Sequence, residues 1–118
     1  MSFHDLLGLD VHIDGEAATI TLDAGDQHLN GHGFVHGGAL ATLADAAMGA
    51  ALNAATGPDA APVTVSLVMT YLEPAPAGPT TATGTITRKG KRITIAEAAV
   101  TAQDGTVVAT AVGTFTTV

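Results

Sequence analysis

Hydrophobic and polar residues alternate along the segment VTVSLVMTYL, which covers residues 63–72. Apolar or aromatic side chains occupy the odd positions from Val63 to Tyr71, whereas the even positions from Thr64 to Thr70 are mostly polar. A period of two is typical of a β-strand with one side on a hydrophobic core. We therefore expect a strand here with its odd positions facing the core, ended by the proline-rich PAPAGP segment.

The rest of the C-terminal half is rich in β-branched residues and predicts three further strands, over residues 80–88, 92–103 and 106–117. Turn-forming residues separate these strands, at Lys89–Lys91 around Gly90 and at Asp104–Gly105. Near the start of the chain, the segments LDVHI and EAATITL flank Asp14–Gly15. This arrangement predicts one more hairpin, for about six strands in total.

Only residues 38–55 have the period of a long helix. Apolar side chains recur there every three or four residues and form one stripe, as in an amphipathic helix. The stripe consists of Leu40, Leu43, Ala44, Ala47, Met48, Ala51 and Leu52. Gly57–Pro58 is expected to end this helix.

One long helix among hairpin-connected strands predicts an α+β fold. The sheet must cover its apolar face, and only this helix is available to do so. The small alanines of the helix allow strands to approach closely. We therefore expect a curved antiparallel sheet wrapped around one long central helix. With 118 residues, the chain (1–118) is expected to form a single domain.

Composition excludes several classes of function. The chain has no cysteine, which excludes disulfides, thiolate metal sites and a cysteine nucleophile. A net charge of −7 argues against nucleic-acid binding, which requires a basic surface. The apolar stretch from Gly37 to Ala55 is interrupted by Asp45 and is a poor membrane span. The N-terminal residues resemble no secretory signal, so a cytoplasmic protein is expected.

The chain's only Lys and Arg residues are concentrated in the segment RKGKR, at positions 88–92. In an acidic protein, one positive spot suits the capture of a phosphorylated small molecule. A solvated hairpin tip explains the same cluster equally well.

The sequence HGG, at residues 36–38, stands at the entrance of the predicted helix. The first turn of a helix leaves backbone N–H groups unpaired, and glycines let a ligand oxygen approach them. Such a site can serve as an oxyanion hole, although a tight turn explains the glycines as well. Asp45 flanks the apolar stripe, so it either faces solvent or acts as a base or nucleophile.

Gly37 and Asp45 are eight positions apart, which is roughly 12 Å along a helix. A single carbonyl group cannot contact both residues of one chain, because each contact requires about 3 Å. If both serve one reaction, the helices of two subunits must run antiparallel across a twofold axis. A functional role for both residues therefore requires a dimer.

Several of these segments together resemble the hotdog-fold acyl-CoA thioesterases, over about residues 8–117. The similarity lies in Asn30, in HGG, in Asp45 within GGALATLAD, in TVSLVMTYLEPAPAG and in RKGKR. The nearest branch contains the phenylacetate-pathway thioesterases, the PaaI-like proteins, and the related 4-hydroxybenzoyl-CoA thioesterases. The resemblance implies hydrolysis of an acyl- or aryl-CoA thioester to a free acid and coenzyme A, without a cofactor or metal.

The resemblance also implies roles for individual residues. Asp45 takes the position of the catalytic carboxylate, as nucleophile or as the base that activates water. Gly37 takes the position whose backbone N–H polarises the thioester carbonyl. Asn30 matches an amide near that carbonyl, and His36 matches a histidine near the sulfur. Thr64 matches a Ser or Thr that helps to place the water or the carboxylate, although an ordinary strand threonine is an equal alternative.

Substrate binding is implied for Gly38 beside the oxyanion site and for the basic hairpin, which in this family commonly meets the nucleotide end of coenzyme A. The hairpin residues are Arg88, Lys89, Gly90, Lys91 and Arg92. A homodimer is the implied minimum, and a homotetramer is the expected assembly. The sequence does not identify the acyl group.

Three alternatives compete with this interpretation. His28, His32 and His36 recur every four residues, but two glycines interrupt them, so loop histidines are favoured over a metal site. A hotdog hydratase or dehydratase would pair His36 with Asp45, which are too far apart within one chain. A non-catalytic acyl-CoA-binding protein would need the basic hairpin but not Asp45.

Overall fold

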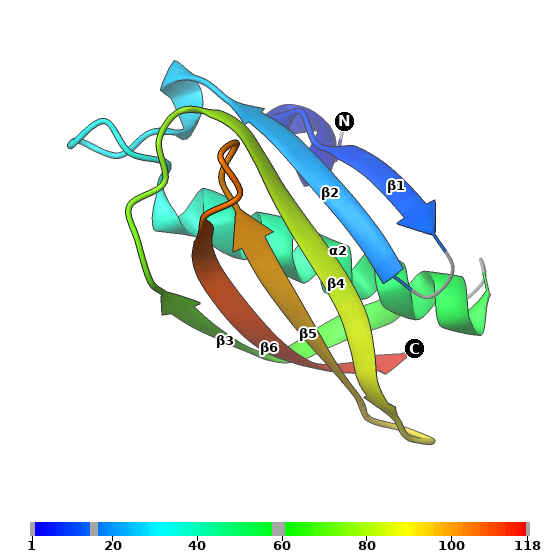
Figure 1. Cartoon of the computed structure of the whole chain (residues 1–118). Coiled ribbons are helices and arrows are strands. Elements are labelled where there is room, and N and C mark those ends of the chain that lie inside the picture. The colour runs from blue at the N-terminus through cyan, green and yellow to red at the C-terminus, as the bar shows by residue number, and fades with distance from the viewer. Residues whose placement is uncertain (1, 15–16, 58–60, 118) are drawn as a thin grey trace.

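The computed structural model describes residues 2–14, 17–57 and 61–117, and within them the chain forms one six-stranded sheet and one long helix (Figure 1). The elements in chain order are α1 (Phe3–Leu7), β1 (Asp10–Asp14), β2 (Ala17–Ala24), the 3-10 turn η1 (Asp26–His28), α2 (Gly37–Thr56), β3 (Pro62–Tyr71), β4 (Gly78–Lys89), β5 (Thr94–Thr101) and β6 (Val107–Thr117).

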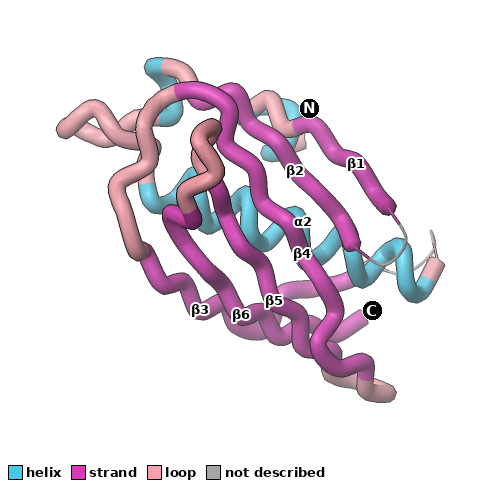
Figure 2. The backbone as a smooth tube through the Cα atoms, viewed as in Figure 1, coloured by secondary structure: helices cyan, strands magenta, loops and turns pink. Residues whose placement is uncertain are grey.

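The strands follow the order β1-β2-β4-β5-β6-β3, and every neighbouring pair is antiparallel. The sheet curves around α2, which packs against all six strands from one side (Figures 1 and 2). This arrangement confirms the predicted α+β fold, with a curved antiparallel sheet wrapped around one central helix. The edge strands are β1 and β3, because each pairs with only one neighbour.

Small side chains allow the sheet to approach the helix closely. All seven residues of the predicted apolar stripe of α2 are buried, and Phe115, Ile20 and Leu22 of the sheet pack in the same core. At Gly84 of β4, a Cβ atom would lie 2.5 Å from the backbone carbonyl of Ala47. The strand can therefore take this position only because residue 84 is glycine.

The bounds of α2 agree with the sequence prediction to within one residue. His36 is the N-cap, and Gly57 is the C-cap with a φ of 101°, which favours glycine. The predicted helix stop also included Pro58, which lies outside the described residues. The predicted turn at Asp14–Gly15 lies partly outside them as well.

The predicted facing of β3 is wrong in its first half. A β-bulge interrupts the pairing with β6 between Thr64 and Ser66, so the side chains change faces there. Thr64 therefore points to the same side as Leu67 and Met69, toward α2, rather than to the opposite side. Val63 and Val65, which the alternation placed on the core, are 44% and 57% exposed.

Helix α1 and η1 were not predicted, and a buried histidine joins them. Nδ1 of His28 accepts a hydrogen bond of 3.0 Å from the N–H of Gly25, and Nε2 lies 2.9 Å from the carbonyl of Leu7. This pattern requires the proton on Nε2. At the other end of α1, Ser2 and Asp5 form a capping box. Both ends of the short helix are thus fixed.

The turn between β5 and β6 is closed by Asp104, whose Oδ1 accepts a hydrogen bond of 2.9 Å from the N–H of Thr106. Hydrogen bonds from Thr106 to the carboxylate hold the pKa of Asp104 below its usual value, because they favour the charged form. The predicted turn at Asp104–Gly105 is confirmed, with Gly105 at a φ of 87°.

Candidate active site along helix α2

The N-terminus of α2 leaves one backbone donor uncommitted. The N–H of Gly38 donates 2.8 Å to Nδ1 of His36, and the N–H groups of Ala39 and Leu40 donate to the backbone carbonyl of His36. Among the described residues, none accepts a hydrogen bond from the N–H of Gly37. Gly37 is therefore the first-turn position that can still bind an oxygen atom of a ligand.

Gly37 lines a cavity of about 500 Å³ together with Asn30, Phe34, Leu40 and Tyr71. Oδ1 of Asn30 accepts hydrogen bonds from the N–H groups of His32 and Phe34, at 2.9 and 3.2 Å. The amide group of Asn30 therefore shapes this loop through its oxygen. The structure brings the predicted residues Asn30 and Gly37 together in one cavity.

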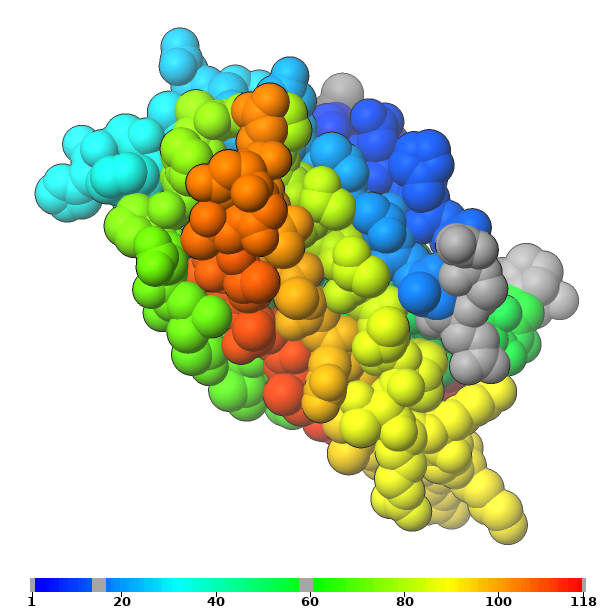
Figure 3. Space-filling view, in the orientation of Figure 1, coloured from blue at the N-terminus to red at the C-terminus, as the bar shows by residue number. Residues whose placement is uncertain are grey.

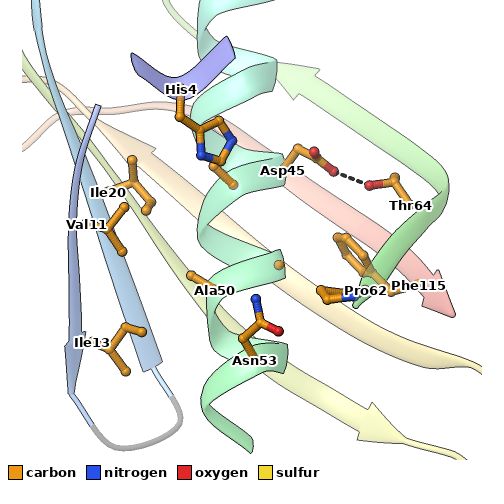
Figure 4. A pocket seen from close by; sticks show the side chains of 12 residues that line it. His4, Val11, Ile13, Ile20, Asp45, Ala50, Asn53, Pro62, Thr64 and Phe115 are labelled. Carbon is orange, nitrogen blue, oxygen red and sulfur yellow. Dashed lines mark hydrogen bonds between the residues drawn. The ribbon is translucent and has the colours of Figure 1, made fainter. Parts of the chain in front are cut away.

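Asp45 lies just over two turns further along α2 than Gly37, in a different environment. Its Oδ1 accepts a hydrogen bond of 2.6 Å from the hydroxyl of Thr64 on β3, across the space between helix and strand (Figure 4). The carboxylate is half-buried, and its second oxygen accepts no hydrogen bond from the described residues. Asp45 and Thr64, both predicted, are thus brought together by the bulge in β3.

Asp45 and Thr64 line a second cavity of about 470 Å³. The cavity runs along α2 to Asn53, between β1 and β2 on one side and β3 and β6 on the other (Figure 4). Its wall combines the polar residues His4, Asp45, Asn53 and Thr64 with apolar contributions from Val11, Ile13, Ile20, Ala46, Ala50, Pro62 and Phe115. Such a chamber is suited to an apolar group attached to a reacting centre at Asp45.

Several polar residues that line these cavities, among them Glu73, were not predicted from the sequence. His4 of α1 lines the cavity beside Asp45, and Asn53 lies at its far end with a buried Oδ1 that has no hydrogen-bond partner. Tyr71 lines the cavity of Gly37. The pattern Ser2-x-x-Asp5 is a capping-box signal and could have revealed α1, and with it His4. No sequence pattern distinguishes Asn53 or Tyr71.

Within one chain, Gly37 and Asp45 do not share a cavity. Their separation of eight positions on a continuous helix corresponds to roughly 12 Å. Within the single chain, one carbonyl group therefore cannot contact both residues. Each of these two cavities contains two of the five predicted catalytic residues, whereas His36 lines neither and lies with Gly38 at a third, smaller cavity.

The edge strand β3 carries an exposed apolar surface. Val65, Val68 and Tyr71 are 57%, 61% and 51% exposed, and one long side of the strand pairs with no other strand in the part of the chain that the structure describes. A ten-residue apolar edge is an open template for pairing with another strand. This edge borders both Thr64 and Tyr71.

The basic hairpin is formed by the end of β4, the turn and the start of β5, and it projects from the body of the molecule (Figure 3). Arg88, Lys89, Lys91 and Arg92 are all exposed. The ammonium group of Lys89 lies 3.4 Å from the carbonyl oxygen of Ala55, near the C-terminus of α2. These four residues line neither of the two cavities.

Two of the three histidines considered as metal ligands already use ring nitrogens in hydrogen bonds within the chain. His28 uses both ring nitrogens, and His36 uses Nδ1 as the cap of α2. In residues 2–14, 17–57 and 61–117, no group of three His, Asp or Glu side chains could hold a metal ion. The helices of this part are also too short or too polar to cross a membrane.

One family of known proteins matches most of this chain. Residues 32–109 match the family model described as the thioesterase superfamily, which spans more than half of the chain and includes Gly37, Asp45 and Thr64. A search of curated proteins found no match.

Solved structures are similar along the whole chain. A conserved protein of Pseudomonas aeruginosa is 30% identical, with a TM-score of 0.94, and the match covers 100% of this chain and 94% of that one. The PaaI protein from the phenylacetic acid degradation operon of E. coli is 31% identical, with a TM-score of 0.88 and coverage of 98% and 83%. A variant of the Thermus thermophilus phenylacetic acid degradation protein PaaI is 30% identical, with a TM-score of 0.88 and coverage of 98% of both chains.

Proposed function

Because the chain belongs to the thioesterase superfamily and has the hotdog fold, we propose that it hydrolyses acyl- or aryl-CoA thioesters to a free acid and coenzyme A. The observation that carries this proposal is that α2 presents both a backbone donor and a carboxylate. Its first turn offers the uncommitted N–H of Gly37, and its flank offers a carboxylate oriented by Thr64. A thioester hydrolase needs a donor for the carbonyl oxygen and a base or nucleophile for the carbonyl carbon.

In this proposal, the N–H of Gly37 donates to the thioester oxygen and stabilises the negative charge that develops on it. Asp45 takes a proton from water while the water oxygen bonds to the carbonyl carbon. Alternatively, its carboxylate attacks that carbon itself and forms a mixed anhydride once the sulfur has left, and water then hydrolyses the anhydride to the free acid and the carboxylate. The tetrahedral centre then collapses, the carbon–sulfur bond breaks, and the sulfur leaves with the electron pair. Nδ1 of His36 accepts from Gly38, so the neutral ring carries its proton on Nε2, a donor that suits a place near the sulfur.

We further propose that two chains form each reaction site, because one chain holds the donor and the carboxylate in different cavities. Two copies of α2 that run antiparallel across a twofold axis bring Gly37 of one subunit to Asp45 of the partner subunit. The apolar, unpaired edge of β3 supports this arrangement, since a second copy of the same strand can cover it. A dimer is then the minimum assembly, with a tetramer of two such dimers as the expected form.

The basic hairpin is proposed to hold the phosphates at the nucleotide end of coenzyme A. Its exposed guanidinium and ammonium groups can form charge-assisted hydrogen bonds with phosphate oxygens. The acidic remainder of the chain repels the same phosphates, so the hairpin is the favoured docking point. We propose that the protein acts in the cytoplasm, with acyl-CoA as its substrate.

The decisive experiment measures thiol release from a panel of aryl- and alkyl-CoA esters. Replacing Asp45 with Ala or Asn is expected to reduce kcat about 10²- to 10⁴-fold, as for loss of a general base. Unchanged thiol release in both Asp45 variants would contradict the assignment of the carboxylate. If the wild-type protein binds these esters but releases no thiol, the alternative of a non-catalytic acyl-CoA-binding protein replaces the proposal.

The donor role of Gly37 has its own test. Gly37 is the first residue of α2, where proline is well tolerated, and proline has no N–H. Gly37→Pro should reduce kcat about 10²- to 10³-fold, as when an oxyanion-hole donor is removed. Gly37→Ala is the matched control, because its Cβ makes the same contact with Tyr71 but its N–H remains. Equal losses in the two variants would assign the effect to crowding.

A further inference from the structure

Tyr71 is bound to the glycine that carries the proposed oxyanion donor. Its hydroxyl donates a hydrogen bond of 2.7 Å to the backbone carbonyl of Gly37. The aromatic ring also lies over this residue, since a Cβ built on Gly37 would be 3.2 Å from Cζ of Tyr71. β3 and the first turn of α2 are therefore joined at Gly37 by both a hydrogen bond and a ring contact.

This contact restrains a segment that would otherwise be unusually free. Two consecutive glycines, Gly37 and Gly38, begin the helix, and glycine has the largest backbone freedom of any residue. An N–H group at a fraying helix end points in many directions. Oxyanion stabilisation, by contrast, depends on donors that are already oriented before the substrate arrives.

The two glycines are held from both sides. On one side, Nδ1 of His36 accepts the N–H of Gly38 at 2.8 Å. On the other side, Tyr71 holds the carbonyl of Gly37. Neither contact uses the N–H of Gly37, which stays available in the cavity that Tyr71 also lines.

A role in general stability explains Tyr71 less well. Within the single chain, the side chain is 51% exposed and lies outside the buried core, so it contributes little to the apolar core of its own subunit. Its hydroxyl is directed at one backbone atom of the proposed site, and the phenolic ring would be in tight contact, at 3.2 Å, with a Cβ at position 37.

We propose that Tyr71 is a positioning residue for the reaction: its hydroxyl and ring fix the conformation of Gly37, so that the Gly37 N–H points into the cavity. This inference rests on the proposed thioesterase function. It assigns Tyr71 no contact with substrate, because its effect passes through the peptide backbone.

The test compares the wild-type protein with Tyr71→Phe, which removes the hydroxyl and keeps the ring. Loss of one hydrogen bond is expected to lower kcat about five- to tenfold with little change in KM, because the donor acts mainly on the transition state. Tyr71→Ala removes the ring contact as well and should lower kcat further. Thermal unfolding of both variants shows whether the fold is retained.

A second readout reports on the donor directly. A non-hydrolysable ketone analogue of acyl-CoA, with a methylene group between carbonyl and sulfur, is bound to each variant, and its carbonyl stretch is measured by infrared spectroscopy. The wild-type protein should shift this band to lower wavenumber, and Tyr71→Phe should shift it less. A role confined to stability would lower the unfolding temperature without moving the band.

The outcomes separate the two levels of the proposal. If the wild-type protein releases no thiol from any acyl-CoA, the proposed function fails. If it releases thiol, and Tyr71→Phe keeps both the wild-type kcat and the wild-type band position, the role of Tyr71 is refuted while the function stands.

Discussion

The hydroxyl of Thr64 donates a 2.6 Å hydrogen bond to Oδ1 of Asp45, which joins β3 to the middle of α2. A carboxylate bound through one oxygen keeps a fixed rotamer and leaves the other oxygen for a water molecule or substrate. Thr64→Val preserves the shape of the side chain but removes the donor. We expect kcat to fall about tenfold, which corresponds to one hydrogen bond, as measured by thiol release at saturating substrate.

Thr64→Ser is the control for this substitution, because it retains the hydroxyl and should keep kcat within about twofold of the wild-type value, far less than loss of the bond itself costs. If valine and serine gave the same rate, the hydrogen bond would have no part in the reaction, and Thr64 would be an ordinary strand residue.

Subunit mixing tests whether a site is built from two chains. Asp45→Ala and Gly37→Pro each remove one half of every site, so each variant alone should be nearly inactive. A mixed dimer of the two variants regains one intact site. After subunit exchange of equal amounts, roughly one quarter of the wild-type activity should return, because half of the dimers are mixed and each has one of two sites.

The control for mixing combines Asp45→Ala with Thr64→Val. Asp45 and Thr64 are hydrogen-bonded within one chain, so both belong to the same half of a site. In a mixed dimer of these two variants, one site lacks the Asp45 carboxylate and the other lacks the Thr64 hydroxyl, so no intact site is regained. Recovery no greater for the first pair than for this one would contradict a site built from Gly37 of one subunit and Asp45 of the partner subunit.

The basic hairpin can be tested with a shortened substrate. Replacing Lys89 and Lys91 with Ala should raise KM for acyl-CoA, and the increase should be larger at low salt, where screening is weaker. The corresponding acyl-pantetheine thioester lacks the nucleotide phosphates, so its KM should not change. An equal rise for both substrates would mean that the lysines act elsewhere, for example through the contact of Lys89 with Ala55.

The contact of Gly84 with the helix predicts a large effect on stability. A Cβ at this position meets backbone atoms of Ala47 at 2.5 Å, and backbone atoms in a packed helix cannot move aside cheaply. Gly84→Ala should therefore lower the free energy of unfolding by about 3 kcal/mol, as in severe overpacking. Thr85→Ala, at the exposed neighbouring position, should change it by less than about 0.5 kcal/mol in urea titrations.

The sequence predicts the helix and the strands well because the hydrophobic patterns that mark them are long and regular. The apolar stripe of α2 runs from Leu40 to Leu52, between three and four turns, and every member of it is buried. The catalytic candidates on α2 could also be found, because a carboxylate and a glycine pair are conspicuous on an alanine-rich helix. Their separation into two cavities follows from helix geometry alone.

The parts that escaped prediction depend on pairing rather than on local pattern. Alternation in residues 63–71 continues unbroken through Val65, so nothing in the sequence marks the bulge that turns Thr64 toward Asp45. The bulge arises from the register with β6, and register is a property of two strands. Tyr71 was similarly assigned to the core by its position, whereas the structure places its hydroxyl on Gly37.

The distribution of the donor and the carboxylate over two cavities has a consequence for how the protein behaves on dilution. If a lone chain carries two incomplete halves, catalysis arises only when copies meet. Specific activity would then fall steeply below the dissociation constant of the pair and recover on concentration. The expression level would set both the amount of the protein and the fraction of it that is assembled into active dimers.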